Sequence, residues 1–302
     1  MRDEAAWAVM VAQHGVIDRA GARRAGLTDR QIKRRVDRGE WVRLAPGVYR
    51  HAGITRSWRG ELMAACMMLR GIASHRSAAV LHEMEGFRPG GRDVSVAHGR
   101  YARIGGIRLH QSTQMDRAAP AILDGIPCTG LARTVLDVSH DVSYRRLEDT
   151  VDALIRDGRL EWKDLVSVLT RHARRGRNGA ASLRRFLDAR TGDESIPLSV
   201  WNRIAIDLLV AAGLPEPRLE YRVLRVDGSL VAQVDLGYPA SKIAIELDSV
   251  RFHLNREAFE RDRRRWNALV AEGWTVLAFT WADFIDRPHE VIARVRAALA
   301  NA

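Results

Sequence analysis

The strongest local signal in the sequence is a short basic helix that begins after Thr28. Thr28 is a typical helix N-cap residue, and Gln31 stands three residues later, where a capping box requires Glu or Gln. Ile32 and Val36 are spaced i, i+4, so they share one face of the helix, and we expect that face to be buried. Gly39 follows as the residue that ends the helix. The surrounding chain must therefore cover one side of this helix and leave its basic side exposed.

The segments around this helix predict a winged helix-turn-helix over residues 1–53. The expected elements are helices over residues 5–13, 19–25 and 29–38, a strand over 41–44, a turn over 45–47 and a return strand over 48–50. A helix-turn-helix places its second helix in the major groove of DNA. The predicted element order therefore makes the basic helix the recognition helix.

Basic side chains on this helix and on the hairpin are the predicted DNA contacts. They are Arg30, Lys33, Arg34, Arg38 and Arg43. Arginine forms paired hydrogen bonds to guanine edges and to phosphate. Residues 1–53 contain 11 Lys and Arg against 6 Asp and Glu, a net charge of +5. The alternative is a solvated basic helix that binds a protein or has lost DNA binding.

The length and charge of the whole chain agree with a multidomain protein that binds a polyanion. A chain of 302 residues exceeds what one core usually serves, and its net charge of +11 makes nucleic acid or an anionic membrane the first partners to consider. The predicted winged helix favours double-stranded DNA between the two. We expect a multidomain α/β (α+β) fold, with a winged helix over residues 1–53, a mixed α/β middle over 54–192 and a third domain over 193–302. The oligomeric state stays open.

The remaining composition predicts a cytoplasmic protein. Cys66 and Cys128 stand in apolar surroundings without a metal-binding spacing, so we expect reduced core residues. The first residues lack the apolar core of a signal peptide, and no apolar run approaches the ~20 residues of a membrane span. His75 is expected to be a capping or packing residue.

The C-terminal segment predicts an αβββαβ domain around a mixed sheet. Its expected elements are a helix over residues 198–212, strands over 219–224, 230–236 and 243–247, a helix over 256–272, a strand over 275–280 and a last helix. Acidic residues interrupt two of the apolar strands. Asp235 stands in one, while Glu246 and Asp248 stand in the other and share a face because strand side chains alternate.

These carboxylates are candidate metal ligands. A buried carboxylate is costly unless it is paired or binds a metal, so Asp235, Glu246 and Asp248 are expected to converge on one Mg²⁺. Mg²⁺ and an activated water are what phosphodiester hydrolysis needs. His253 is the candidate general base or phosphate ligand, and the arginines of residues 261–265 offer cations for the scissile phosphate.

Residues 15–17, 26–28 and 39–49 resemble the N-terminal winged helix of AbiEi-type antitoxins. The run Pro46-Gly47-Val48-Tyr49, which closes the hairpin, is the most specific part. Residues 74–79 and 129–134 are similar to the region that follows in that family, so the resemblance covers roughly residues 1–190. It implies binding to operator DNA, repression of the protein's own operon and action opposite a nucleotidyltransferase toxin.

A second resemblance covers about residues 194–298. The segments 211–215, 234–236, 244–248, 262–265 and 273–277, together with His253, are similar to PD-(D/E)xK-type nucleases, in particular to very-short-patch-repair-like endonuclease domains. Two positions depart from that pattern. Asn202 stands where the first helix usually offers a Glu to the metal, and Ser249 stands where Gly usually follows the acids.

Two functions therefore compete. The first is a Mg²⁺-dependent DNA endonuclease whose winged helix grips the substrate, and the intact Asp235, Glu246 and Asp248 favour it. The second is an AbiEi-like antitoxin and transcriptional repressor of a toxin-gene operator, and Asn202 favours it. In that case the nuclease-like domain is silent and its acids bind neighbouring arginines. Antitoxin action through protein contacts alone is a third alternative.

Overall fold

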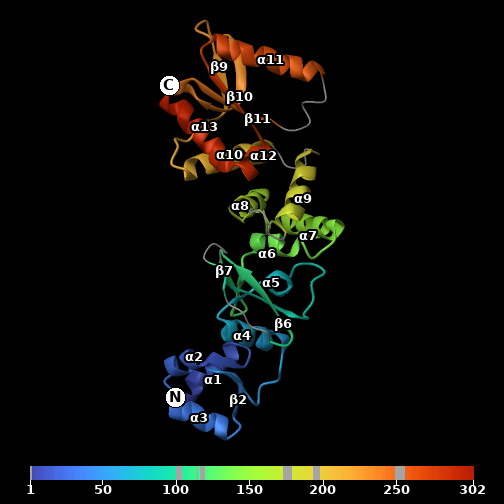
Figure 1. The fold of residues 1–302 in the computed structure, drawn as a ribbon, viewed down its shortest axis with the longest axis vertical. Coiled ribbons are helices and arrows are strands. Elements are labelled where there is room, and N and C mark those ends of the chain that lie inside the picture. The colour runs from blue at the N-terminus through green and yellow to red at the C-terminus, as the bar shows by residue number, and fades with distance from the viewer. Residues whose placement is uncertain are drawn as a thin grey trace. The chain divides into compact units, whose positions relative to one another are not determined.

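The computed structural model describes residues 2–99, 104–113, 115, 120–172, 179–192, 198–248 and 256–302. The chain divides into two compact units, Met1–Leu160 and Glu161–Ala302. Helices occur in both units, together with two sheets in the first unit and one in the second, which confirms a mixed α and β composition (Figure 1). The three-part division, with boundaries after residues 53 and 192, stays a prediction.

The first 51 residues contain the predicted three helices and hairpin, with one additional strand. The elements are α1 (Arg2–Ala12), β1 (Val16–Asp18), α2 (Arg19–Arg24), α3 (Asp29–Asp37), β2 (Trp41–Ala45) and β3 (Val48–His51). Strand β1 was not predicted. It pairs antiparallel with β3, so the sheet has the order β1-β3-β2.

One core joins these helices to the sheet. Its buried residues are Ala6, Met10, Ile17, Ala22, Leu27, Ile32, Trp41 and Tyr49. Ile32 is thus buried as its position on α3 predicts, while Val36 is only partly buried against the same cluster. The apolar face of α3 therefore rests on a core to which α1, α2 and all three strands contribute.

The rest of the first unit is built on a five-stranded sheet. Its elements are α4 (Trp58–Leu69), β4 (Ile72–Ala73), α5 (His75–Leu81), β5 (Arg92–Ala97), β6 (Ile107–Ser112), β7 (Pro120–Leu123), β8 (Ile126–Thr129), α6 (Leu131–Val138) and α7 (Tyr144–Arg156), and the strand order is β6-β5-β4-β8-β7. Val16 and Val48 share a core with Leu62 of α4, so the N-terminal segment and the middle pack as one unit.

The second unit has the predicted αβββαβ order, preceded by two helices. Its elements are α8 (Trp162–His172), α9 (Ala180–Gly192), α10 (Leu198–Ala211), β9 (Arg218–Leu224), β10 (Leu230–Tyr238), β11 (Ile243–Asp248), α11 (Arg256–Ala271), β12 (Thr275–Thr280), α12 (Trp281–Asp286) and α13 (Pro288–Ala300). The sheet is mixed, with the order β12-β11-β10-β9, because only the β11–β12 pair is parallel.

Helices cover both faces of this sheet. Residues of α10 and α13 share one core with β10, β11 and β12, whereas Leu269 of α11 packs with Val223, Val234 and Ala244 on the opposite face. Figure 1 shows α11 on one side of the strands and α10 and α13 on the other. The single terminal helix that we predicted is two helices, because Pro288 begins a new one after Asp286.

Both cysteines are core residues, as expected. Cys66 and Cys128 are buried in the cluster beneath the five-stranded sheet, and neither forms a disulfide. Burial raises the pKa of the Cys66 thiol to about 12 and that of Cys128 to about 11, because the thiolate loses its hydration. Within the described part of the chain, no helix has the length and apolar character needed to cross a bilayer.

Candidate nucleic-acid interface

The cap predicted for α3 is present in full. The Thr28 side-chain oxygen accepts a hydrogen bond from the Gln31 backbone N–H at 3.3 Å, and the Gln31 side chain accepts one from the Thr28 N–H at 2.8 Å. These bonds satisfy two donors that a helix start otherwise leaves without partners. The first turn of the helix is therefore fixed by local contacts.

A fork of ion pairs joins α2 to the start of α3. The guanidinium of Arg19 donates to both carboxylate oxygens of Asp29, with Nε–Oδ1 at 2.9 Å and Nη2–Oδ2 at 2.6 Å, and Arg23 does the same from the next turn of α2. The hydrogen bond from Arg19 is the largest effect that holds the pKa of Asp29 well below its usual range. The sequence reasoning missed this fork, although all three residue types are visible in the sequence.

The turn between the two helices requires Gly26. Gly26 has φ +90°, in the left-handed region, and the Leu27 N–H donates to the Ala22 carbonyl at 3.1 Å. Glycine is favoured there because it has no Cβ to clash with the neighbouring carbonyl. The turn directs the chain from α2 into the Thr28 cap.

The predicted recognition residues lie on the exposed side of α3. Arg30, Lys33, Arg34 and Arg38 are all exposed. Lys33 forms an i, i+4 ion pair with Asp37 at 2.6 Å, and Arg38 lies 3.8 Å from Glu40. Among the described residues, the side chains of Arg30 and Arg34 form no ion pair or hydrogen bond. Their spacing of four places these two guanidinium groups on the same side of the helix.

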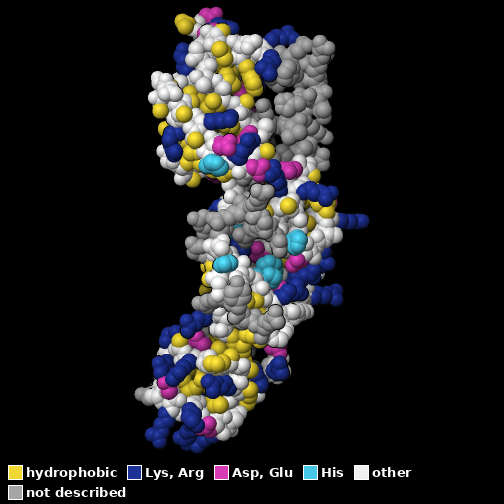
Figure 2. Space-filling model, in the orientation of Figure 1, with side chains coloured by type: hydrophobic (Ala, Val, Ile, Leu, Met, Phe, Trp, Pro, Cys, Tyr) yellow, Lys and Arg dark blue, Asp and Glu magenta, His cyan; other side chains and the backbone are white. Residues whose placement is uncertain are grey.

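The hairpin adds a further basic residue beside this helix. Arg43 is exposed on β2, and the turn that follows is joined to the start of α2 by a hydrogen bond from the Arg19 N–H to the Gly47 carbonyl at 2.7 Å. Gly47 adopts φ +78°, which a side chain would strain. Figure 2 shows Lys and Arg side chains gathered over the part of the first unit where Figure 1 places α3.

The predicted metal ligands of the second unit are described only in part. Asp235 lies on β10, and its Oδ2 accepts a hydrogen bond from the Leu247 N–H of β11 at 2.7 Å. Glu246 on β11 is only 3% exposed, and its Oε2 lies 3.1 Å from Nη2 of Arg265. The Asp248 side chain, His253 and Ser249 lie outside the described residues, so the convergence of the three acids stays a prediction.

Asn202 is buried on α10, with 2% exposure, and its Oδ1 accepts no hydrogen bond from the described residues. Within that same part of the chain, no three His, Cys, Asp or Glu side chains come close enough to hold a metal ion. Neither observation tests a site that includes Asp248.

The first unit also contains a group of titratable side chains that the sequence reasoning did not bring together. The imidazole rings of His75 and His110 stack at 3.5 Å between centroids, and His110 Nε2 lies 2.8 Å from Oδ1 of Asp93. Asp93 is 1% exposed. Burial is the main cause that lowers the pKa of His75 to about 4, because a charged imidazole would lose its hydration.

Comparison with protein families supports the expectation for the N-terminus. Residues 10–51 match the family model described as "Transcriptional regulator, AbiEi antitoxin". The match spans β1, α2, α3 and the β2–β3 hairpin. It therefore coincides with the part of the chain that presents Arg30 and Arg34.

Longer matches lead to proteins whose printed names state no function. Two uncharacterized proteins of Mycobacterium tuberculosis, MT2308 of strain CDC 1551 / Oshkosh and Rv2248 of strain ATCC 25618 / H37Rv, are each 25% identical over 273 residues, covering 89% of this chain and 96% of the relative. The crystal structure of the RV2827C protein from the same species is also similar, with 13% identity and a TM-score of 0.41. The superposition covers 74% of this chain and 88% of the RV2827C chain.

Proposed function

We propose that this protein is a DNA-binding transcriptional regulator of the AbiEi antitoxin type. The observation that carries the proposal is the coincidence of the family match over residues 10–51 with a capped helix on which the exposed side chains of Arg30 and Arg34 have no protein partner among the described residues. In this proposal residues 1–53 form a winged helix-turn-helix. The ligand is double-stranded DNA, and a toxin-gene operator is the specific target that the family suggests.

In this proposal the basic residues have separate roles. Arg30 and Arg34 enter the major groove and contact base edges and phosphates, because α3 is the exposed second helix of the motif. Arg43 of the hairpin contacts the neighbouring backbone. Arg19 and Arg23 are committed to Asp29 and therefore hold α3 in place.

The test is binding of the full chain to labelled duplex DNA at several salt concentrations. We expect the affinity to fall steeply with salt, because each neutralised phosphate releases counterions. Arg34→Ala should weaken binding by roughly 5- to 150-fold, about 1–3 kcal/mol. It should also reduce the slope of log affinity against log salt concentration by about one.

The matched control is Arg145→Ala, which removes the same charge from an exposed site on α7. It should leave the affinity nearly unchanged. Salt-independent binding, or equal losses in the two variants, would overturn the assignment of α3 as the recognition helix.

A Mg²⁺-dependent endonuclease is the second candidate function, favoured by the two acids on adjacent strands β10 and β11. Carboxylate oxygens are the ligands that Mg²⁺ prefers, so Asp235, Glu246 and Asp248 fit the ion in kind. Bound Mg²⁺ would supply charge stabilisation and an activated water. In the described structure Arg265 binds Glu246, and this guanidinium would have to release the carboxylate before a metal could bind.

A further inference from the structure

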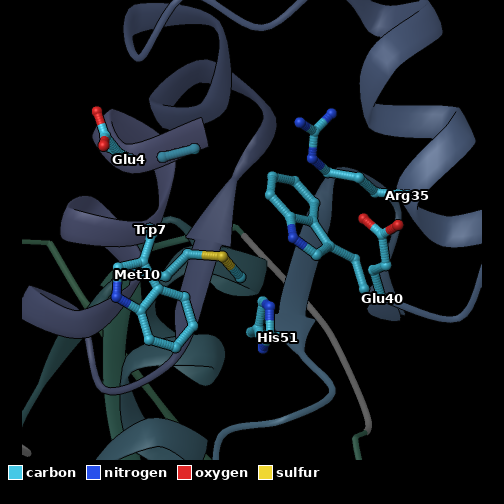
Figure 3. A pocket seen from close by; sticks show the side chains of 8 residues that line it. Glu4, Trp7, Met10, Arg35, Glu40 and His51 are labelled. Atoms are coloured by element: carbon cyan, nitrogen blue, oxygen red, sulfur yellow. The ribbon is translucent and has the colours of Figure 1, made fainter. Parts of the chain in front are cut away.

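A pocket of about 350 Å³ lies in the N-terminal part of the first unit, between α1 and the sheet (Figure 3). Helix α1 lines it with Trp7 and Met10, and β2 lines it with Trp41. Figure 3 shows the Met10 side chain beside the Trp7 ring. The volume is in the range of small-molecule sites, which begins at about 300 Å³.

The walls of this pocket are aromatic and partly open to solvent. Trp7 is 46% exposed, although it is a large apolar side chain. Its ring meets the His51 ring edge-on, with 4.9 Å between centroids and 78° between planes. Because His51 contacts the indole in this edge-to-face manner, solvent-exposed indole surface remains for another group.

The charged side chains at this pocket differ from those of the surrounding domain. Glu4 and Glu40 contribute two carboxylates to the lining, and Arg35 contributes one guanidinium. Glu40 is exposed and lies 3.8 Å from Arg38, a distance at which an exposed pair is weak. Residues 1–53 have a net charge of +5, whereas the lining of this pocket has two carboxylates against one guanidinium.

The protein already places one cation on one of these indoles. The Arg35 guanidinium carbon lies 5.8 Å from the centre of the Trp41 ring, within the distance of a cation–π contact. Trp is the aromatic residue that attracts cations most strongly. Trp7 presents the same chemistry, and among the described residues no cation–π contact is made to it.

We propose that this pocket binds an organic cation, a guanidinium or alkylammonium group with a short apolar stem. The cation lies against Trp7, the stem contacts Met10, and the exposed carboxylate of Glu40 neutralises the charge. An anion would meet two carboxylates and one guanidinium, so it is disfavoured. The ligand is either a free amine or guanidine, or an Arg side chain of a partner protein.

This proposal does not depend on DNA binding. Arg35 follows Arg34 by one residue and Arg30 by five, so it points to a different side of α3 from the predicted DNA contacts. A protein without DNA affinity would still have the pocket. The pocket is therefore tested by direct ligand binding, without DNA.

The test is calorimetric titration of the full chain with N-acetyl-arginine amide and with N-acetyl-citrulline amide, its neutral isostere. We expect saturable binding of the arginine compound and at least about tenfold weaker binding of the citrulline compound. Equal binding of both compounds, or binding of neither by this chain, would overturn the proposal.

Two variants locate the site, and a third is the control. Trp7→Leu and Glu40→Gln should each weaken binding by about 2- to 30-fold. Both residues are exposed, and a circular dichroism spectrum checks that each variant is folded. Glu216→Gln changes an exposed carboxylate in the second unit and should have no effect. Unchanged affinity in Trp7→Leu would also overturn the proposal.

The source of the cation is decided by two probes that share the guanidinium. The first is n-butylguanidine, and the second is a blocked Gly-Arg-Gly peptide; each carries one positive charge. Tighter binding of n-butylguanidine assigns the pocket to a small molecule, because the peptide backbone then adds only steric cost. Equal or tighter binding of the peptide assigns it to a partner protein.

Discussion

Asp29 is a single carboxylate that determines how two helices meet. Both Arg19 and Arg23 reach it from consecutive turns of α2, while its own backbone begins α3. An acidic residue in the first turn also interacts favourably with the helix dipole. The position of Arg30 and Arg34 relative to α2 therefore depends on a residue that itself makes no DNA contact in our proposal.

His75 makes the stability of the first unit depend on pH. Burial lowers its pKa from 6.5 to about 4. Between these two pH values the imidazole is protonated in the unfolded chain and neutral in the folded chain. The free energy of unfolding therefore has its full value above about pH 6.5 and declines as the pH falls toward about 4. The loss should reach about 3 kcal/mol.

The measurement is the melting temperature of wild type and His75→Asn from neutral pH to about pH 4. Asparagine tolerates the left-handed backbone at this position, where φ is +48°. The variant should lose less stability on acidification than wild type. His289→Asn removes an exposed histidine and should follow the wild-type curve. Parallel curves for wild type and His75→Asn would contradict the prediction.

At the scale of elements, local signals were sufficient where one segment contains all the interacting residues. The bounds of α3 follow from Thr28 and Gln31, and the mixed sheet of the second unit was predicted strand by strand. Short strands paired with distant segments were missed. Strand β1 has three residues whose partners lie near Arg50, and Ala73 of β4 pairs with Cys128. Three or two residues are too few to establish an alternating pattern.

The candidate sites show the same difference between contacts within one segment, which were predicted, and contacts between distant segments, which were missed. Arg30 and Arg34 were predicted because they occupy one helix. The fork at Asp29 depends on the angle between two helices, and the His75–His110 stack joins residues that are 35 positions apart. The pocket between Trp7 and Trp41 likewise requires α1 to pack beside β2. Nothing in the spacing of these residues indicates their proximity.

The cap of α3 gives a prediction at this scale. Thr28→Ala removes the acceptor for the Gln31 N–H, so the N-terminal segment should lose about 1 kcal/mol of stability, with a modest loss of DNA affinity. Thr28→Ser keeps the hydroxyl and should retain both. Chemical unfolding and DNA titration of the two variants measure these effects. A Thr28→Ala protein as stable as Thr28→Ser would mean that the core alone holds α3.

At the scale of the whole molecule, the open question is whether the function needs both units or only the first. The first unit contains the family match and the basic helix, and the second contains the acidic strands. A nuclease needs both, because one grips DNA and the other cleaves it. A repressor needs only the first, with the second as a folded module in which Arg265 neutralises Glu246.

Metal dependence separates these two cases. If the second unit binds Mg²⁺, Asn202→Glu should increase its affinity for the ion, because the substitution adds one carboxylate charge to the predicted ligands. The melting temperature should then rise with Mg²⁺, and more so in the variant than in wild type. Plasmid incubated with Mg²⁺ or Mn²⁺ should be cleaved, EDTA should stop the cleavage, and Asp235→Asn should abolish it.

If the second unit is silent, Asn202→Glu should have the opposite effect. Asn202 is buried, so a carboxylate there would lose its hydration without a metal to neutralise it, and the variant should melt below wild type with or without Mg²⁺. The sign of the change in melting temperature therefore decides between the two functions. Because Arg265 already binds Glu246 in the described structure, we expect the destabilised outcome, in agreement with the proposed transcriptional regulator.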